Sequence, residues 1–191
     1  MKKKTIGFAM TGSFCTFERV LRVMRTLVEQ GCDILPIMSD NAYGTSTRFG
    51  RAEHIVEQVE AITGKSVIHT IPQAEPIGPR GMCDLIVVAP CTGNTLSKLS
   101  LGITDTPVTM AVKSQLRIGA PVLLAVATND ALGASAQNIG RLMNTKNIYF
   151  VPMSQDDPER KPSSLVASFE RIPACIDQVL SHGQPMPVLT G

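Results

Sequence analysis

The residues that most constrain the fold lie between positions 84 and 107, D-L-I-V-V-A-P-C-T-G-N-T-L-S-K-L-S-L-G-I-T-D-T-P. An unbroken apolar run over 85–89 predicts a β-strand that is buried on both faces. Small hydroxyl and amide residues follow it, and Thr92 or Asn94 can cap a helix that ends at Gly102. Because this arrangement aims free backbone N–H groups beyond the end of the strand, we expect an anion there, most simply a phosphate.

A second turn of the same kind opens the chain. Residues 5–10 are apolar enough for a central strand, Thr11-Gly12-Ser13 interrupts them, and apolar residues at helical spacing continue up to Gly31. The turn matches neither G-x-G-x-x-G nor G-x-x-x-x-G-K-S/T, so it is neither the dinucleotide fingerprint nor the Walker loop. The pattern predicts the start of a nucleotide-type fold without assigning a nucleotide.

Strand and helix patterns alternate along the whole chain. They predict an α/β fold, a Rossmann-like, doubly wound parallel sheet of six strands with helices on both faces, in a single domain over 1–191. A C-terminal helix over 165–179, broken at Pro173, and a tail are expected within 163–191. The strands are expected at 5–10, 33–38, 67–71, 85–89, 122–127 and 148–151, and the other helices at 17–28, 52–62, 92–102, 106–119 and 132–143.

The composition argues against several classes of function. The net charge is +2 and aromatic residues make up 4% of the chain, so it has neither the basic patch nor the stacking surfaces of a nucleic-acid-binding protein. The opening Met-Lys-Lys-Lys precedes too short an apolar stretch for a signal peptide, and no apolar run reaches the about 18 residues of a membrane span. We expect a cytoplasmic protein that binds neither nucleic acid nor membranes.

The five cysteines and three histidines are dispersed. No C-x-x-C or H-x-x-x-H pair occurs, so we expect reduced thiols and no metal site. A helix N-terminus lowers the pKa of a nearby thiol, which makes Cys91 a candidate nucleophile. The favoured interpretation of Cys91 is a small buried residue.

Three irregular stretches, 40–50, 72–82 and 152–163, interrupt the pattern. The first two lie near the carboxyl ends of strands, where the loops of α/β sheets hold ligands. The third is rich in charged residues, and it predicts either a solvated loop or one that closes over a site or grips a partner.

Several of these segments together resemble the homo-oligomeric flavin-containing cysteine decarboxylase superfamily of flavoproteins. The resemblance lies in T-G-S after the first strand, Ser39 after the second, V-A-P-x-T-x-N-T-L-x-K-L-x-x-G-I-x-D after the fourth and T-N after the fifth. It implies FMN bound between the subunits of a trimer or a dodecamer, or a phosphate in the same site. By this resemblance Gly12, Ser13 and Ser39 would hold the phosphate, and Pro90, Thr92, Asn94 and Thr95, with Cys91 among them, would line the phosphate and the isoalloxazine.

The chain departs from the decarboxylases of this superfamily in two places. Their histidine, about fourteen residues before the motif proline, falls here on Pro76, and His69 is the nearest histidine. Of their substrate clamp, P-x-M-N-x-x-M-W, only Asn129 remains. An FMN-dependent decarboxylase or a flavin prenyltransferase therefore stays an alternative, but with an altered pocket.

The second half of the chain is similar to one branch of the superfamily, through T-N-D-A-L-G and N-T-K-N-I-Y-F-V-P. Members of that branch act in spore-forming bacteria together with a nicotinamide-binding subunit, which carries NAD(P). The resemblance implies oxidation of a dihydro precursor to pyridine-2,6-dicarboxylate. Guanidinium forks suit carboxylates, so Arg48, Arg51, Arg80 and Lys113, with Asn129, are candidates to hold the substrate. A non-catalytic partner that stabilises the nicotinamide-binding subunit is the other alternative.

Overall fold

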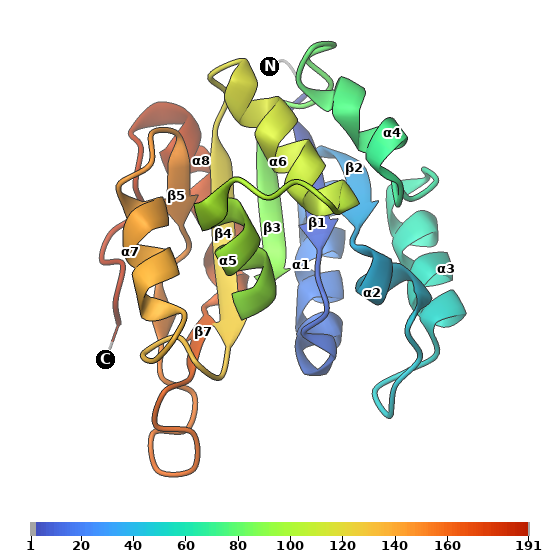
Figure 1. The fold of residues 1–191 in the computed structure, drawn as a ribbon. Helices are drawn as coiled ribbons and strands as arrows, with labels where there is room; N and C mark the ends of the chain where they lie inside the picture. Colours follow the sequence, from blue (N-terminus) through green and yellow to red (C-terminus); the bar gives the residue numbers. More distant parts are fainter. Residues whose placement is uncertain (1–2, 191) are drawn as a thin grey trace.

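The computed structural model describes residues 3–190 and contains one seven-stranded, mostly parallel sheet. The strand order is β2-β1-β3-β4-β7-β6, and β5 pairs with β4 beside this path. In Figure 1 the arrowheads of β1, β3 and β4 point to the lower edge of the sheet. The strands are β1 (Thr5–Met10), β2 (Asp33–Met38), β3 (Leu85–Cys91), β4 (Val122–Thr128), β5 (Ile148–Phe150), β6 (Met153–Ser154) and β7 (Leu165–Ala167).

Helices cover both faces of the sheet, and each face has its own apolar core. Figure 1 shows α5, α6 and α7 in front of the sheet and α1 and α8 behind it. Leu96, Val108 and Ile139 belong to the front core, and Val20 and Ile176 to the back core. The helices are α1 (Phe17–Glu29), α2 (Asp40–Gly44), α3 (Ala52–Thr63), α4 (Ile71–Ala74), α5 (Gly93–Leu101), α6 (Pro107–Arg117), α7 (Ala136–Met143) and α8 (Ile172–Ser181), with 3₁₀ turns η1 (Phe14–Thr16), η2 (Glu75–Ile77) and η3 (Phe169–Arg171).

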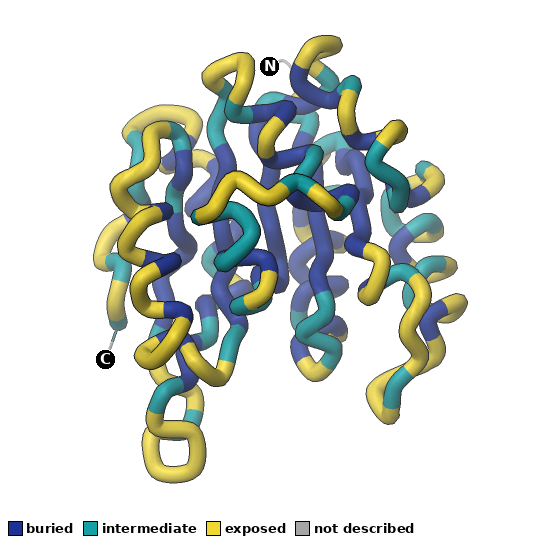
Figure 2. Tube along the Cα trace, viewed as in Figure 1, coloured by how far each residue is buried: buried dark blue, intermediate teal, exposed yellow. Residues whose placement is uncertain are grey.

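The central strands are buried from both sides, as their apolar runs predict. All seven residues of β3 are buried, and the dark blue centre of Figure 2 follows β1, β3 and β4. The order of the strands in the sheet reverses at β1, because β2 pairs with one edge of β1 and β3 pairs with its other edge. Ligands of such sheets bind outside the carboxyl ends of the strands at this switch point.

The predicted helix signals act as expected. The Thr92 hydroxyl caps α5, and Gly102 ends that helix with a left-handed φ of 72°. Thr106 and Thr109 form a capping box at the start of α6, with Pro107 in its first turn. None of the helices within residues 3–190 is long and apolar enough to span a membrane.

Two predicted elements have a different structure, and the sheet has seven strands instead of six. In addition, α2 forms within 40–50, and most of α4 and all of η2 form within 72–82, two stretches that were expected to be irregular. Residues 67–71 form only an isolated bridge, between Ile68 and Ile37, because Thr70 already caps α4 in a capping box. Residues 165–167 are the strand β7, not helix, because Val166 pairs antiparallel with Ala127 of β4. The last helix therefore begins at Ile172, and Pro173 lies in its first turn, where a proline is tolerated.

Candidate functional site

The turns after β1 and β3 are joined by hydrogen bonds at the switch point. The buried Thr11 hydroxyl donates to the Pro90 carbonyl oxygen at 2.7 Å and accepts the Thr92 N–H at 3.1 Å. The Thr11 N–H also donates to the Pro90 carbonyl at 3.3 Å. Thr11 therefore fixes the two predicted turns against each other. Its position directly after a strand was the only sequence signal for this role.

Two helix N-termini face the same space. Thr92 Oγ1 accepts the Thr95 N–H at 3.3 Å, and Ser39 Oγ accepts the Ala42 N–H at 3.3 Å. These hydroxyls satisfy only part of the first turn of each helix. The N–H groups of Asp40 and Asn41 in α2, and of Gly93 and Asn94 in α5, have no hydrogen-bond partner within the described residues and can bind a ligand.

A cavity of about 430 Å³, called cavity 1 below, lies between these helix starts. Five of the predicted cofactor residues line it: Gly12, Ser39, Thr92, Asn94 and Thr95. Pro90 and Cys91 lie just behind it in the buried end of β3, and Ser13 lines a neighbouring cavity. The structure thus brings together the groups that were predicted from two separate turns.

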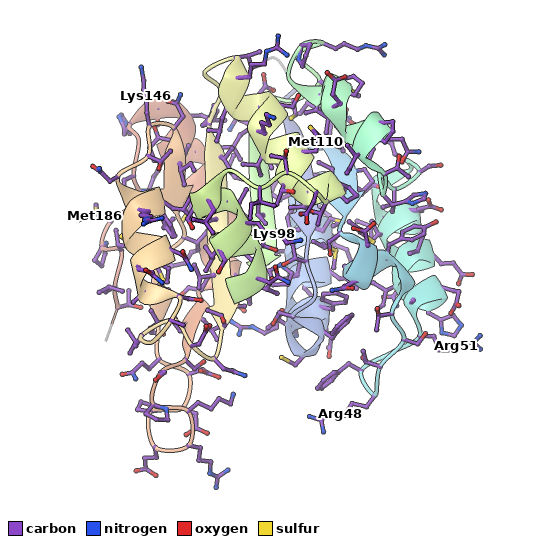
Figure 3. The ribbon with its side chains drawn as sticks, in the orientation of Figure 1. Arg48, Arg51, Lys98, Met110, Lys146 and Met186 are labelled. Atoms are coloured by element: carbon purple, nitrogen blue, oxygen red, sulfur yellow. The ribbon has the colours of Figure 1, made fainter. Side chains whose placement is uncertain are left out.

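Charged residues on one wall of cavity 1 were missed by the sequence analysis. Lys98 of α5 donates to Asp105 at 2.8 Å, and this hydrogen bond lowers the pKa of the Asp105 carboxyl. Figure 3 labels Lys98 on the front of the molecule. Both residues belong to the segment K-L-x-x-G-I-x-D, so their spacing across the end of α5 was a signal that could have been used. Cavity 1 is also lined by two carboxylates, Asp105, which pairs with Lys98, and Asp40 in the first turn of α2. The groups that suit the phosphate of a ligand such as FMN are therefore the N–H groups and hydroxyls at the two helix starts.

Cys91 is not an activated thiol. It is completely buried, and desolvation raises its pKa far above the usual value. The structure agrees with the interpretation of Cys91 as a small buried residue.

A polar cluster supports the N-terminus of α5 from the side of β4. A Cβ atom added at Gly93 would lie 2.7 Å from Thr128 Oγ1 and 2.9 Å from both Asp130 Oδ1 and Ser135 Oγ. Asp130 accepts hydrogen bonds from the Thr128 and Ser135 hydroxyls. The close approach of these side chains requires glycine at position 93. The hydrogen bonds to Asp130 hold the loop that carries Asn129.

A second cavity, called cavity 2 below, has a volume of about 410 Å³ and shares Gly12 and Thr92 with cavity 1. Asn129 lines cavity 2. The other predicted substrate residues, Arg48, Arg51, Arg80 and Lys113, line neither cavity. Figure 3 shows Arg48 and Arg51 at the periphery, where Arg48 lies 4.8 Å from the Phe49 ring centroid and Arg51 pairs with Glu53 at 3.6 Å.

No histidine within residues 3–190 lines either cavity. His69 stacks on Tyr43 with ring centroids 4.0 Å apart, and Pro76 lies in η2. No group of three metal-ligating side chains occurs in this described range.

Known proteins are similar to this chain in sequence and in fold. The flavoprotein family model matches residues 1–181. The B subunit of dipicolinate synthase from Bacillus subtilis (strain 168) is 46% identical over 189 residues, which cover 99% of this chain and 94% of that protein.

Two solved structures extend the comparison. The dipicolinate synthase B subunit from Bacillus halodurans C superposes with a TM-score of 0.90 at 44% identity, covering 98% of this chain and 96% of that one. DmrB of Burkholderia xenovorans, described as a cubic protein cage for redox transfer in complex with FMN, shares the fold with a TM-score of 0.68 at 18% identity, covering 94% and 97% of the two chains. The chain belongs to the flavoprotein family.

Proposed function

We propose that the chain is the flavin-binding subunit of a dipicolinate synthase in the mother cell of a sporulating bacterium. With the A subunit of that enzyme, which binds NAD(P), it oxidises a dihydrodipicolinate-type precursor to pyridine-2,6-dicarboxylate. The observation that carries the proposal is the 46% identity with a dipicolinate synthase B subunit over 99% of the chain. The turn after β1 lacks the G-x-G-x-x-G fingerprint, which is consistent with a separate nicotinamide-binding subunit.

FMN is the cofactor that cavity 1 suits best. The free N–H groups at the starts of α2 and α5 face the cavity beside the Ser39 and Thr92 hydroxyls, which suits a phosphate. When bound, the flavin would supply an acceptor for the hydride that the precursor loses, together with a proton, as its ring becomes aromatic. The chain itself would hold the phosphate, orient the flavin and place the substrate against it.

The two alternatives predict different properties. A histidine close to the flavin would favour the first alternative, an FMN-dependent decarboxylase or a flavin prenyltransferase. No histidine of the described residues lines either cavity. A non-catalytic partner would keep the fold without needing a flavin. The visible absorption spectrum of the purified protein separates that role from the proposed one.

Product formation should require both proteins, this chain and the nicotinamide-binding subunit. We expect the rise in ultraviolet absorbance of pyridine-2,6-dicarboxylate when precursor, nicotinamide cofactor and both proteins are mixed, and at least a tenfold slower rise with either one alone. Rates across a range of mixing ratios measure this requirement. If the mixture were no faster at any ratio than the nicotinamide-binding subunit without this chain, the proposed function would be wrong.

We also expect the chain to assemble with copies of itself beside cavity 1. Leu101, the last residue of α5, and Ile103, in the segment between α5 and α6, are 60% and 42% exposed, shortly before Asp105 and Thr106 of the cavity wall. Figure 2 shows this segment exposed across the front face. We infer that these two exposed apolar side chains beside the cavity contact a neighbouring copy, which would enclose the flavin.

Light scattering should therefore report a trimer or a dodecamer. Leu101→Lys should shift the population towards monomer and weaken FMN binding, whereas Leu180→Lys, a matched change on α8, should do neither. A wild-type monomer at micromolar concentration that still held its flavin would contradict this expectation.

A further inference from the structure

Cavity 2 carries two cationic side chains from distant parts of the chain. Arg19 comes from α1, and Lys161 from the segment between β6 and β7 that projects below the sheet in Figure 1. Asn129 and Thr128, at the end of β4, and the Asp156 carboxylate also belong to the polar wall. Neither cation lines cavity 1, so a ligand bound in cavity 1 does not account for them.

Arg19 is held in a fixed orientation with donors to spare. Its Nε and Nη2 atoms donate to the two carboxylate oxygens of Glu170 at 3.0 and 3.1 Å, and its guanidinium carbon lies 5.0 Å from the Phe169 ring centroid. A guanidinium has five N–H donors, and the Glu170 carboxylate takes two of them. The remaining edge can bind a second carboxylate without a conformational search, and this preorganisation favours binding.

Lys161 is held in a similar way by Asp156. The Lys161 ammonium donates to Asp156 Oδ2 at 2.7 Å, and Ser164 Oγ donates to Asp156 Oδ1 at 2.6 Å. Burial opposes ionisation of Asp156, but the hydrogen bonds from Lys161 and Ser164 still lower its pKa. The ammonium therefore stays charged beside an ionised carboxylate, with two of its three N–H donors left for a ligand.

Hydrogen bonds fix the segment between β6 and β7, so Lys161 forms a defined part of the wall of cavity 2. The Lys161 N–H donates to the Asp157 carbonyl at 2.7 Å, and Gln155 Nε2 donates to the Pro162 carbonyl at 2.8 Å. The Leu132 N–H donates to the Ser163 carbonyl at 2.9 Å, which fastens the segment to the loop after β4. Most of residues 155–163 are exposed, which agrees with the solvated loop predicted for this stretch, and Asp156 and Lys161 are the two of its residues that border cavity 2.

We propose that cavity 2 is the substrate subsite, in which Arg19 and Lys161 each bind one carboxylate of a small dicarboxylate. Asp156 also lines the cavity, but Arg19 and Lys161 each keep N–H donors that their own carboxylate partners do not use, so a dianion can pair with both cations. The volume of about 410 Å³ falls within the range of small-molecule sites, about 300–1,000 Å³. Because Gly12 and Thr92 border both cavities, a ring bound here would lie next to a ligand in cavity 1. This inference rests on the proposed function for the identity of the dicarboxylate.

Binding of pyridine-2,6-dicarboxylate, measured by calorimetry on the purified full-length protein, tests the two cations. Arg19→Gln and Lys161→Gln should each weaken binding at least tenfold, because each removes a charge-assisted hydrogen bond. The wild type should bind pyridine-2-carboxylate at least tenfold more weakly than the dicarboxylate. Arg25→Gln on the same helix and Lys146→Gln at the opposite end of the sheet (Figure 3) should leave affinity unchanged, since neither lines cavity 2.

A test on the unaltered protein uses its own thiols. Cys15 is exposed and lines cavity 2, whereas Cys32 is half-buried and lines a cavity at the other end of the sheet. Pyridine-2,6-dicarboxylate should slow alkylation of Cys15 by iodoacetamide at least fivefold and leave that of Cys32 unchanged, as read by peptide mass spectrometry. The same rate at Cys15 with and without the dicarboxylate would overturn the proposal, as would wild-type affinity in both glutamine variants.

The two proposals can fail separately. Product formation by the mixed proteins without protection of Cys15 would refute the subsite and leave the proposed function intact. Protection of Cys15 and loss of affinity in both variants, but no product from any mixture with the nicotinamide-binding subunit, would support a dicarboxylate subsite and refute the proposed oxidation.

Discussion

Gly78→Ala should lower the free energy of unfolding by about 3 kcal/mol or more, the upper range for overpacking a close contact. A Cβ atom at this position would lie 1.8 Å from the Ser114 carbonyl oxygen and 2.4 Å from its carbonyl carbon. Both are backbone atoms of α6, so no side-chain rotation can relieve the overlap. The Gly78 N–H also donates to Ser114 Oγ at 2.8 Å, and that hydroxyl donates to the Glu75 carbonyl at 2.6 Å.

Urea titration followed by circular dichroism measures the loss, and Gly140→Ala is its matched control. Gly140 lies in α7, and an added Cβ would have no atom within 4 Å. Alanine should therefore stabilise that helix by up to about 1 kcal/mol. Equal effects of the two substitutions would show that the segment 75–78 does not pack against α6 as described.

The elements that could be predicted are those whose signals are local. The apolar run at 85–89 and the Thr106-Pro107 helix start could be identified because their signals, an unbroken apolar stretch and a capping residue followed by proline, lie in adjacent residues. The anion turns belong to the same class. Thr92 was expected from its position after a strand, whereas Gly12 and Ser39 were expected from the family resemblance. All three meet because parallel strands end at one edge of the sheet.

The elements that could not be predicted depend on distant partners. The strand β7 has three residues, too few for a periodic pattern, and its conformation follows from pairing with Ala127 and Thr128. The apolar spacing of 165–179 imitates a helix across the strand, a 3₁₀ turn and α8. Residues 67–71 have the composition of a strand, but Thr70 forms the capping box of α4, so the helix begins at Ile71.

The cationic residues show the same limit of prediction from sequence, both those chosen from the sequence and those that the structure places at cavity 2. Arg48, Arg51, Arg80 and Lys113 were chosen by chemistry alone, and the structure places none of them in a cavity wall of the site. Arg19 and Lys161 are far apart in sequence, and each carries an acid partner that the sequence does not identify. Tertiary packing alone brings them to one cavity.

Ser39→Asp should lower the affinity for FMN at least 100-fold relative to Ser39→Asn. Ser39 caps α2 through its hydroxyl and lines cavity 1. Aspartate and asparagine have the same size and both cap helices well, so the two variants differ only in charge at this position. A carboxylate about 4 Å from a phosphate repels it by about 4 kcal/mol per unit charge pair at an effective dielectric constant near 20. A 100-fold loss, about 2.8 kcal/mol, is therefore a lower estimate.

Fluorescence quenching of the free flavin measures this difference, and riboflavin is the control ligand because it lacks the phosphate. Riboflavin should bind both variants with the same affinity, and equal FMN affinities in the two variants would place the phosphate away from Ser39. The aspartate variant also decides how the chain takes part in the oxidation. If the flavin accepts the hydride, Ser39→Asp mixed with the nicotinamide-binding subunit should form no product at FMN concentrations that saturate Ser39→Asn. If the chain only completes a substrate pocket for its partner, the two variants should form product at equal rates, because neither change reaches the cations of cavity 2.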